Sequence, residues 1–226
     1  MPLRKGRLVK VEKINEYIDH TMLKAYAKEE DIIKLCNEAT QYGFKSVCVN
    51  PYYVEFVKNY LTKINSKVKI CTVIGFPLGQ NTTKTKIFET QDALENGAEE
   101  IDMVINIAAL LDKKYEYVKN EIEEIRKVTQ NNILKVIIET CYLEDEDIKI
   151  MTKICSELQV DYIKTSTGFG KRGASENDVF LMNKHRSNNL QIKASGGISD
   201  YDTAKKMVEL GATRLGTSKS IQICEK

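Results

Sequence analysis

The sequence predicts an α/β protein built as a single (β/α)8 TIM barrel, and three observations support this fold class. Short apolar runs typical of strands alternate along the chain with amphipathic stretches typical of helices. Eight such runs occur in 226 residues, so each strand-helix unit has about 28 residues. The first run is not followed by the Gly-rich turn that would favour the alternative, an open doubly wound sheet.

The eight expected strands are short runs rich in apolar residues. The first surrounds Ile18-Asp19-His20, and the others are FKSVCV (44–49), VKICTVIG (68–75), EEIDMVI (99–105), ILKVIIE (133–139), VDYIK (160–164), LQIKA (190–194) and ATRLG (212–216). Because strands and helices alternate strictly, we expect a parallel sheet covered by helices.

The segments between these runs carry apolar residues at helical spacing. Examples are Ile32, Leu35, Cys36 and Ala39, and then Ile148, Met151, Ile154, Cys155 and Leu158. Residues suited to helix ends punctuate the pattern: Gly43, Gly97 and Gly211 before strands, and Ser175 and Ser199 as N-caps. The alternation of helices and strands is thus continuous, and no segment typical of an interdomain linker interrupts it.

One domain is expected over residues 14–226, with a short helical extension at its start and a basic N-terminal arm at 1–13. The arm has five Lys or Arg residues, but the formal net charge of the chain is only +2, so we expect no nucleic-acid partner. No apolar run approaches the roughly 18 residues of a membrane-spanning helix, so we expect no membrane contact.

The cysteines and histidines indicate the cellular compartment and limit the kinds of metal site that are possible. The six cysteines are dispersed without a CxxC pair, which indicates free thiols in a reducing compartment and a cytoplasmic protein. Only two histidines are present, so a site with several histidine ligands to a metal is excluded.

Two lysines stand at the ends of neighbouring expected strands. Lys164 is followed by the small residues TSTG, and Lys193 by ASGG. They are 29 residues apart, about one strand-helix unit, so we expect them at matching places on strands whose axes lie about 4.8 Å apart. A single lysine at a strand end is usually solvated. Two that face one another in a barrel are different, because burial and a like charge both lower the pKa of a lysine and favour a neutral, nucleophilic amine.

Acidic residues accompany the lysines. Asp102 lies in the middle of the run 99–105, and a carboxylate inside a barrel strand is rarely left unpaired. It forms either a structural ion pair or a proton-transfer partner for a lysine, and pairing with Lys193 would allow both. Asp19, at the end of the first run, is a possible further member of the proton network. His20 could equally be a hydrogen-bonded structural residue.

Glycines and small hydroxyl residues follow the last two expected strands, as SGGISD (195–200) and GTSK (216–219). In barrel enzymes the loops after these strands often bind phosphate through backbone N–H groups. The residues expected to surround a phosphate are Gly168, Gly196, Gly197, Gly216, Ser218 and Lys219.

These features favour Schiff-base chemistry on a phosphorylated carbonyl compound, with the iminium as an electron sink for making or breaking a C–C bond. The shortage of histidines argues against a zinc-dependent aldolase. Two alternatives remain. One is another Schiff-base barrel aldolase acting on a related sugar phosphate, and the other is a barrel that binds phosphorylated metabolites without catalysis.

The same stretches resemble the deoxyribose-phosphate aldolase family. The shared motifs are IDHTMLK (18–24), VCVNP (47–51), VIGFPLG (73–79), EIDMVIN (100–106), KVIIET (135–140), YIKTSTGFG (162–170), IKASGGIS (192–199) and RLGTS (214–218). The resemblance implies a class I aldolase, without metal or cofactor, that reversibly cleaves 2-deoxy-D-ribose 5-phosphate to D-glyceraldehyde 3-phosphate and acetaldehyde. It also implies a homo-oligomer, a dimer or a tetramer.

Carried over by motif, the resemblance implies a role for each site residue. Lys164 forms the Schiff base, Lys193 modulates the pKa of that amine and joins the proton relay, and Asp102 is the proton donor and acceptor, working through water. The sequence departs from the family at Lys219-Ser220, where Ser-Gly or Ser-Leu is usual, so we expect an altered phosphate affinity. The last helix is expected to be short, because about ten residues follow the eighth run.

Overall fold

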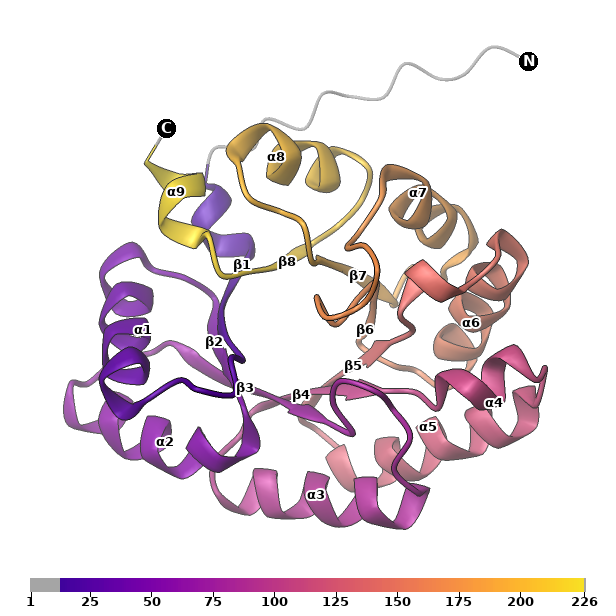
Figure 1. Cartoon of the computed structure of the whole chain (residues 1–226), viewed down its shortest axis with the longest axis horizontal. Helices are drawn as coiled ribbons and strands as arrows, with labels where there is room; N and C mark the ends of the chain where they lie inside the picture. The colour runs from indigo at the N-terminus through magenta and orange to yellow at the C-terminus, as the bar shows by residue number, and fades with distance from the viewer. Residues whose placement is uncertain (1–12, 226) are drawn as a thin grey trace.

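Eight parallel strands form a closed ring in which each strand pairs with the next in the sequence and β8 pairs with β1 (Figure 1). The strands are β1 (Ile18–Met22), β2 (Ser46–Val49), β3 (Lys69–Ile74), β4 (Glu100–Val104), β5 (Ile133–Ile137), β6 (Tyr162–Lys164), β7 (Gln191–Ser195) and β8 (Arg214–Thr217). The barrel prediction is confirmed, and the open doubly wound sheet is excluded.

The computed structural model describes residues 13–225, so the basic arm expected at 1–13 lies, apart from Lys13, outside the described residues. Helices surround the ring (Figure 1). They are η1 (Ile14–Tyr17), α1 (Glu29–Tyr42), η2 (Pro51–Tyr53), α2 (Val54–Lys63), α3 (Thr83–Glu95), α4 (Ile107–Leu111), α5 (Tyr115–Thr129), η3 (Thr140–Tyr142), α6 (Asp145–Glu157), α7 (Glu176–His185), α8 (Tyr201–Glu209) and α9 (Ser220–Cys224). The 3-10 helix η1 is the short extension expected before the first strand. Within the described part of the chain, no helix has the length and apolar character needed to cross a bilayer.

The strands alternate between two environments because successive side chains of a strand point to opposite faces. In β4, Ile101 and Met103 belong to the apolar layer between ring and helices, whereas Glu100 and Asp102 meet charged groups of other strands. The apolar layer also buries the helical face of α1 that the sequence predicted: Ile32, Leu35, Cys36 and Ala39. Because the apolar side chains of β4 face the helices, its alternate side chains, Glu100 and Asp102, lie inside the ring.

Helix ends follow the predicted punctuation with one exception. Gly43 ends α1 in the left-handed conformation, and Ser175 caps α7 by accepting a hydrogen bond from the Asp178 N–H. The prediction for Ser199 is wrong, because Asp200 caps α8 instead. The Asp200 carboxylate accepts hydrogen bonds from both the N–H and the hydroxyl of Thr203, each at 2.9 Å, which a single Ser hydroxyl could not replace.

Candidate active site

A cavity of about 320 Å³ opens at the carboxyl ends of the strands. Its walls come from the segments that follow β1, β6, β7 and β8, and Lys164 forms part of them. All six residues expected to surround a phosphate also line it: Gly168, Gly196, Gly197, Gly216, Ser218 and Lys219. One cavity therefore brings together the expected nucleophile and the expected phosphate site.

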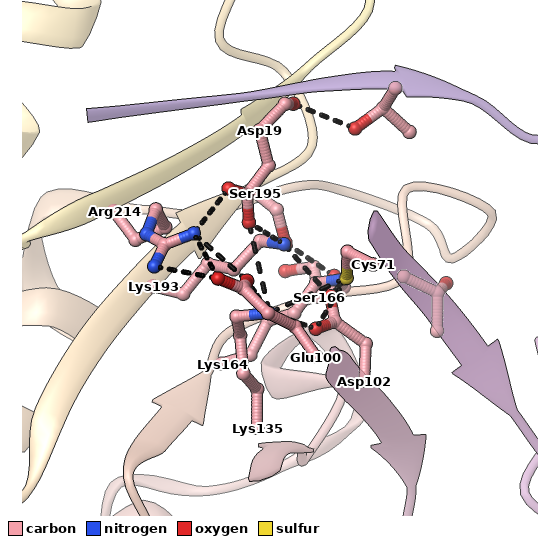
Figure 2. A network of polar contacts seen from close by, with 12 residues as sticks. Asp19, Cys71, Glu100, Asp102, Lys135, Lys164, Ser166, Lys193, Ser195 and Arg214 are labelled. Carbon is pink, nitrogen blue, oxygen red and sulfur yellow. Dashed lines mark hydrogen bonds and ion pairs between the residues drawn. The ribbon is translucent and has the colours of Figure 1, made fainter. Parts of the chain in front are cut away.

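The two lysines lie side by side, as their spacing predicted. Lys164 of β6 is the register partner of Lys193 of β7, and both side chains are buried. Their Nζ atoms donate to the same oxygen, Oδ2 of Asp102, with Nζ–Oδ2 distances of 2.7 Å from Lys164 and 2.8 Å from Lys193 (Figure 2). A single carboxylate oxygen therefore links the two amines.

Asp19 extends this arrangement to the first strand of the ring. Its carboxylate forms a short ion pair with Lys193. The other carboxylate oxygen accepts hydrogen bonds from Arg214 Nη1 at 2.6 Å and from the Ser46 hydroxyl at 2.7 Å. Lys193 is thus held between two carboxylates, Asp19 and Asp102.

Three further charged side chains complete the network, and sequence reasoning did not single them out. Lys135 of β5 contacts Glu100 Oε2 at 2.6 Å and Asp102 Oδ1 at 2.9 Å. Arg214 of β8 contacts Glu100 Oε2 at 2.9 Å. We call the seven residues the ionic cluster; its members are Asp19, Glu100, Asp102, Lys135, Lys164, Lys193 and Arg214 (Figure 2).

The cluster fixes the charge state of most of its members. Burial alone would raise the pKa of Asp102, but the neighbouring lysines, Lys135 first, outweigh burial and hold this pKa well below the usual value. The same balance lowers the pKa of Asp19. Burial would lower the pKa of Lys193, yet the carboxylates of Asp102 and Asp19 raise it overall. The pKa of Lys135 is likewise raised, against burial, by Asp102. Lys193 and Lys135 are therefore ammonium ions near neutral pH.

The end of the cavity where phosphate binding is expected is formed by two loops that are fastened to each other. The Thr217 hydroxyl donates to the carbonyl of Ile198, at 2.7 Å, and accepts from the Lys219 N–H, at 2.9 Å. Gly196 has φ 78°, and a Cβ there would lie 2.9 Å from the Cα of Gly173. Only glycine fits this backbone, so no side chain fills this part of the cavity.

The family model for DeoC/LacD family aldolases matches residues 14–218, which include every strand of the ring. The chain belongs to the DeoC/LacD family of aldolases.

Individual relatives agree with this assignment. The deoxyribose-phosphate aldolase of Thermococcus kodakarensis is 53% identical over 214 residues, which cover 94% of this chain and 96% of the relative. The deoxyribose-phosphate aldolase of Clostridium tetani is 52% identical over 214 residues, which cover 94% of this chain and 98% of the relative. The solved structure of the tetrameric deoxyribose phosphate aldolase from Aeropyrum pernix has a TM-score of 0.87 at 33% identity and covers 94% of this chain and 89% of its own.

The sequence of this aldolase carries a signal for the cluster residues that sequence reasoning missed. Glu100 precedes Asp102 by two residues and therefore shares its face of β4. Lys135 is the register partner of Asp102 on β5. Arg214 is likewise the register partner of Lys193 on β7, although its ion-pair partners, Asp19 and Glu100, come from strands far away in the sequence.

His20 does not contribute to the ionic cluster. Its ring lies on the other side of β1, where it contacts Glu38 of α1 and Ser220 of α9. Of the two roles left open for it, the hydrogen-bonded one matches its contacts.

Two groups of side chains in the described chain have potential metal-ligand atoms within 4.8 Å of one another: Cys48, Cys71 and Asp102, and Asp19, Cys71 and Glu100. All three carboxylates already contact lysine or arginine side chains. A metal cation would have to compete with these buried basic groups. That the aldolase works without a metal stays a prediction.

Proposed function

We propose that this protein is a class I aldolase that reversibly cleaves 2-deoxy-D-ribose 5-phosphate into D-glyceraldehyde 3-phosphate and acetaldehyde through a Schiff base on Lys164. The observation that carries the proposal is the pair of buried lysines that share one oxygen of Asp102 beside a cavity. Curated relatives about half identical in sequence bear the name deoxyribose-phosphate aldolase, which supports the substrate.

The charge balance of the ionic cluster favours Lys164 as the nucleophile. Four basic side chains face three carboxylates, so one positive charge has no buried counterpart. An uncompensated buried charge is strongly unfavourable, and the loss of one proton relieves it. Lys135 contacts three carboxylates and Lys193 two, and an arginine does not deprotonate in proteins. Lys164 has only Asp102 as a carboxylate partner among the described residues, and it alone of the cluster lines the cavity.

The first chemical step is attack by the neutral Lys164 amine on the aldehyde carbon of the open-chain sugar. The resulting carbinolamine loses water and becomes a protonated imine. Asp102, 2.7 Å from the Lys164 nitrogen, is placed to exchange the protons of this step. Lys193 stays protonated beside it and supplies positive charge without competing as a nucleophile.

Cleavage then follows from the electron demand of the imine. A base removes the proton of the C3 hydroxyl, the C2–C3 bond breaks, and its electron pair moves toward the imine nitrogen to give an enamine. The released three-carbon aldehyde is glyceraldehyde 3-phosphate. Protonation of the enamine at C2 and hydrolysis of the imine release acetaldehyde and restore the amine. We assign proton transfer to Asp102, with Lys193 and Asp19 as the relay behind it.

The phosphate group occupies the other end of the cavity in this proposal. Gly168, Gly196, Gly197 and Gly216 keep that end free of side chains, so backbone N–H groups can approach the anion. The exposed residues Ser218 and Lys219 add a hydroxyl and a positive charge. Anchoring the phosphate there orients the aldehyde end toward Lys164.

Reductive trapping tests the proposal. The protein is incubated with 2-deoxyribose 5-phosphate, borohydride is added, and the modified peptide is located by mass spectrometry. We expect the adduct on Lys164 and its loss, together with cleavage activity, in Lys164→Ala. The control Lys171→Ala removes an exposed lysine outside the cavity lining and is expected to retain both.

The other outcomes are equally informative. An adduct on Lys193 would reverse the assigned roles of the two lysines. The absence of any adduct on the folded wild-type protein would favour the non-catalytic barrel that binds phosphorylated metabolites. Cleavage of a different sugar phosphate in preference to this one would favour the related aldolase.

We also propose that the protein acts in the cytoplasm as a dimer or tetramer. The six cysteines are free thiols in the structure, which supports a reducing compartment. The tetrameric relative from Aeropyrum pernix supports a homo-oligomer. Light scattering coupled to size exclusion measures the number of subunits, and a monomer at micromolar concentration would contradict this part.

A further inference from the structure

A chain of three side chains runs beside the phosphate end of the cavity. Nε2 of His20 lies 2.8 Å from Glu38 Oε2, and Nδ1 lies 2.8 Å from the hydroxyl of Ser220. His20 comes from β1, Glu38 from α1 and Ser220 from the first turn of α9. These elements are 18 and 200 residues apart in the sequence, so the contacts are tertiary.

The direction of the hydrogen bonds follows from the partners. A carboxylate only accepts, so His20 must carry its proton on Nε2 and donate to Glu38. Burial lowers the pKa of His20 although Glu38 opposes this, so the ring is neutral near pH 7. In the neutral ring Nδ1 is then an acceptor, and the Ser220 hydroxyl donates to it.

The three residues have the chemical order of a hydrolase triad, but their burial excludes that function. Ser220 is 0% exposed and His20 4% exposed, so the hydroxyl cannot reach a substrate. Its only other acceptor among the described residues is the carbonyl of Thr217, at 3.3 Å. The three residues therefore have a structural role, and Ser220 is not a nucleophile.

What it holds is the loop with the expected phosphate ligands. Ser218 and Lys219 are exposed, and they stand between two buried residues, Thr217 and Ser220. Thr217 fastens one end of this pair to Ile198 in the loop after β7. Ser220 fastens the other end, through His20, to β1 and α1.

We infer that Ser220 and His20 are positioning residues that hold Ser218 and Lys219 in place for the phosphate group of the substrate, with Glu38 orienting the imidazole. This inference rests on the proposed function, because it concerns the phosphate end of the same site. A loop that is fixed before binding loses less conformational entropy when the anion arrives, which strengthens binding without a new contact.

The experiment compares Ser220→Ala with wild type on two substrates, 2-deoxyribose 5-phosphate and unphosphorylated 2-deoxyribose. We expect KM for the phosphate ester to rise about three- to tenfold, the effect of losing one buried neutral hydrogen bond. We expect kcat for the ester, and kcat/KM for the unphosphorylated sugar, to stay near wild type. A merely structural role would alter both substrates alike.

Two substitutions of His20 separate the two halves of the chain. Asn can present an oxygen where Nδ1 stands and so still accepts from Ser220, whereas Gln can present a donor where Nε2 stands and reaches Glu38 only. His20→Gln is therefore expected to raise KM for the ester more than His20→Asn does. The control Ser156→Ala removes a hydroxyl that donates to a helical carbonyl, Thr152 O, at 2.8 Å, away from the cavity, and is expected to leave both substrates unaffected.

Binding of inorganic phosphate, measured by calorimetry, keeps this inference separate from the chemistry. A weaker phosphate affinity in Ser220→Ala supports the inference even if the wild-type protein cleaves neither sugar, a result that would defeat only the proposed function. Unchanged phosphate affinity and unchanged KM, or equal losses on both substrates, would overturn the inference. If Ser220→Ala does not fold, the order of the two His20 variants decides, and an equal KM in both would also overturn it.

Discussion

Replacing Asp102 with Asn tests the centre of the ionic cluster. The change keeps the size of the side chain and removes its negative charge. Oδ2 is the acceptor for Lys164 and Lys193, and Oδ1 contacts Lys135 at 2.9 Å. After the substitution Lys135 keeps Glu100 and Lys193 keeps Asp19, whereas Lys164 loses its one carboxylate partner among the described residues. Four basic groups then face two carboxylates.

Two magnitudes follow from this loss. Proton transfer by a positioned group contributes about 10²- to 10⁴-fold to a rate, so kcat for 2-deoxyribose 5-phosphate should fall by that factor without vanishing. Removing one partner from a buried ion pair costs about 3–5 kcal/mol, so the free energy of unfolding should fall by a similar amount. Part of that cost is recovered if a lysine of the cluster gives up its proton.

The assay couples acetaldehyde to an NADH-dependent alcohol dehydrogenase for kcat, and urea unfolding measures stability. Asp112→Asn serves as the matched control, since Asp112 forms an exposed pair with Lys114 and such pairs contribute little. A folded Asp102→Asn protein with kcat within threefold of wild type would refute the assignment of proton transfer. Unchanged stability would refute the charge balance derived from the cluster.

The pH dependence of stability gives an independent check on Asp102. Its folded-state pKa is below 3.8, the ordinary value for the side chain. The stabilising contribution is therefore complete above about pH 3.8 and is lost as the pH falls further toward the folded pKa. Wild type should lose stability in this acid range more steeply than Asp102→Asn. Parallel urea midpoints for the two proteins between pH 5 and 2.5 would contradict the depressed pKa.

Other substitutions probe separate parts of the structure. Lys193→Leu should fold and lose most of the cleavage rate, because the cation beside the reactive amine is gone; a near-normal kcat would show that no cationic neighbour is needed. Gly196→Ala should raise KM for the phosphate ester at least several-fold, since the new Cβ would meet Gly173 and the backbone has φ 78°; an unchanged KM would mean that the loop tolerates it. Lys86→Met should lower stability by about 3–5 kcal/mol, because it leaves Glu121 buried without its ammonium partner at 2.8 Å. Lys86→Met with Glu121→Leu should recover most of this loss, and a double variant as unstable as the single one would contradict the pairing argument.

The sequence was enough to predict the barrel and the two lysines because a regular repeat converts separation along the chain into position in space. One unit of about 28 residues separates neighbouring strands, so residues 29 apart, Lys164 and Lys193, end up as register partners. Gly43 and Ser175 were predictable for a local reason, since caps depend on only a few neighbouring residues. The prediction that Ser199 caps α8 was wrong for an equally local reason, because the next residue, Asp200, is a better acceptor.

The rest of the ionic cluster was harder to predict because it depends on which face of a strand turns inward. Glu99 and Glu100 are adjacent, yet Glu99 pairs with Lys69 in a partly exposed contact and Glu100 is 1% exposed inside the ring. A shift of one residue would exchange them. Lys135 looks like an isolated charge in an apolar strand unless it is aligned with Asp102, its register partner, which lies 33 residues earlier, about one strand-helix unit. The roles assigned to the site residues remain predictions for the experiments above.

The contact between Asp19 and Arg214 also bears on how the protein acquires activity during synthesis. The two residues are 195 positions apart, and they meet only where β8 closes the ring against β1. A growing chain cannot form this contact until the last strand has been made. Folding therefore depends on pairs very distant in sequence, which slows it compared with proteins rich in local contacts. Closure of the ring and pairing of Asp19 with Arg214 are therefore one event, and the ionic cluster is complete only when the ring has closed.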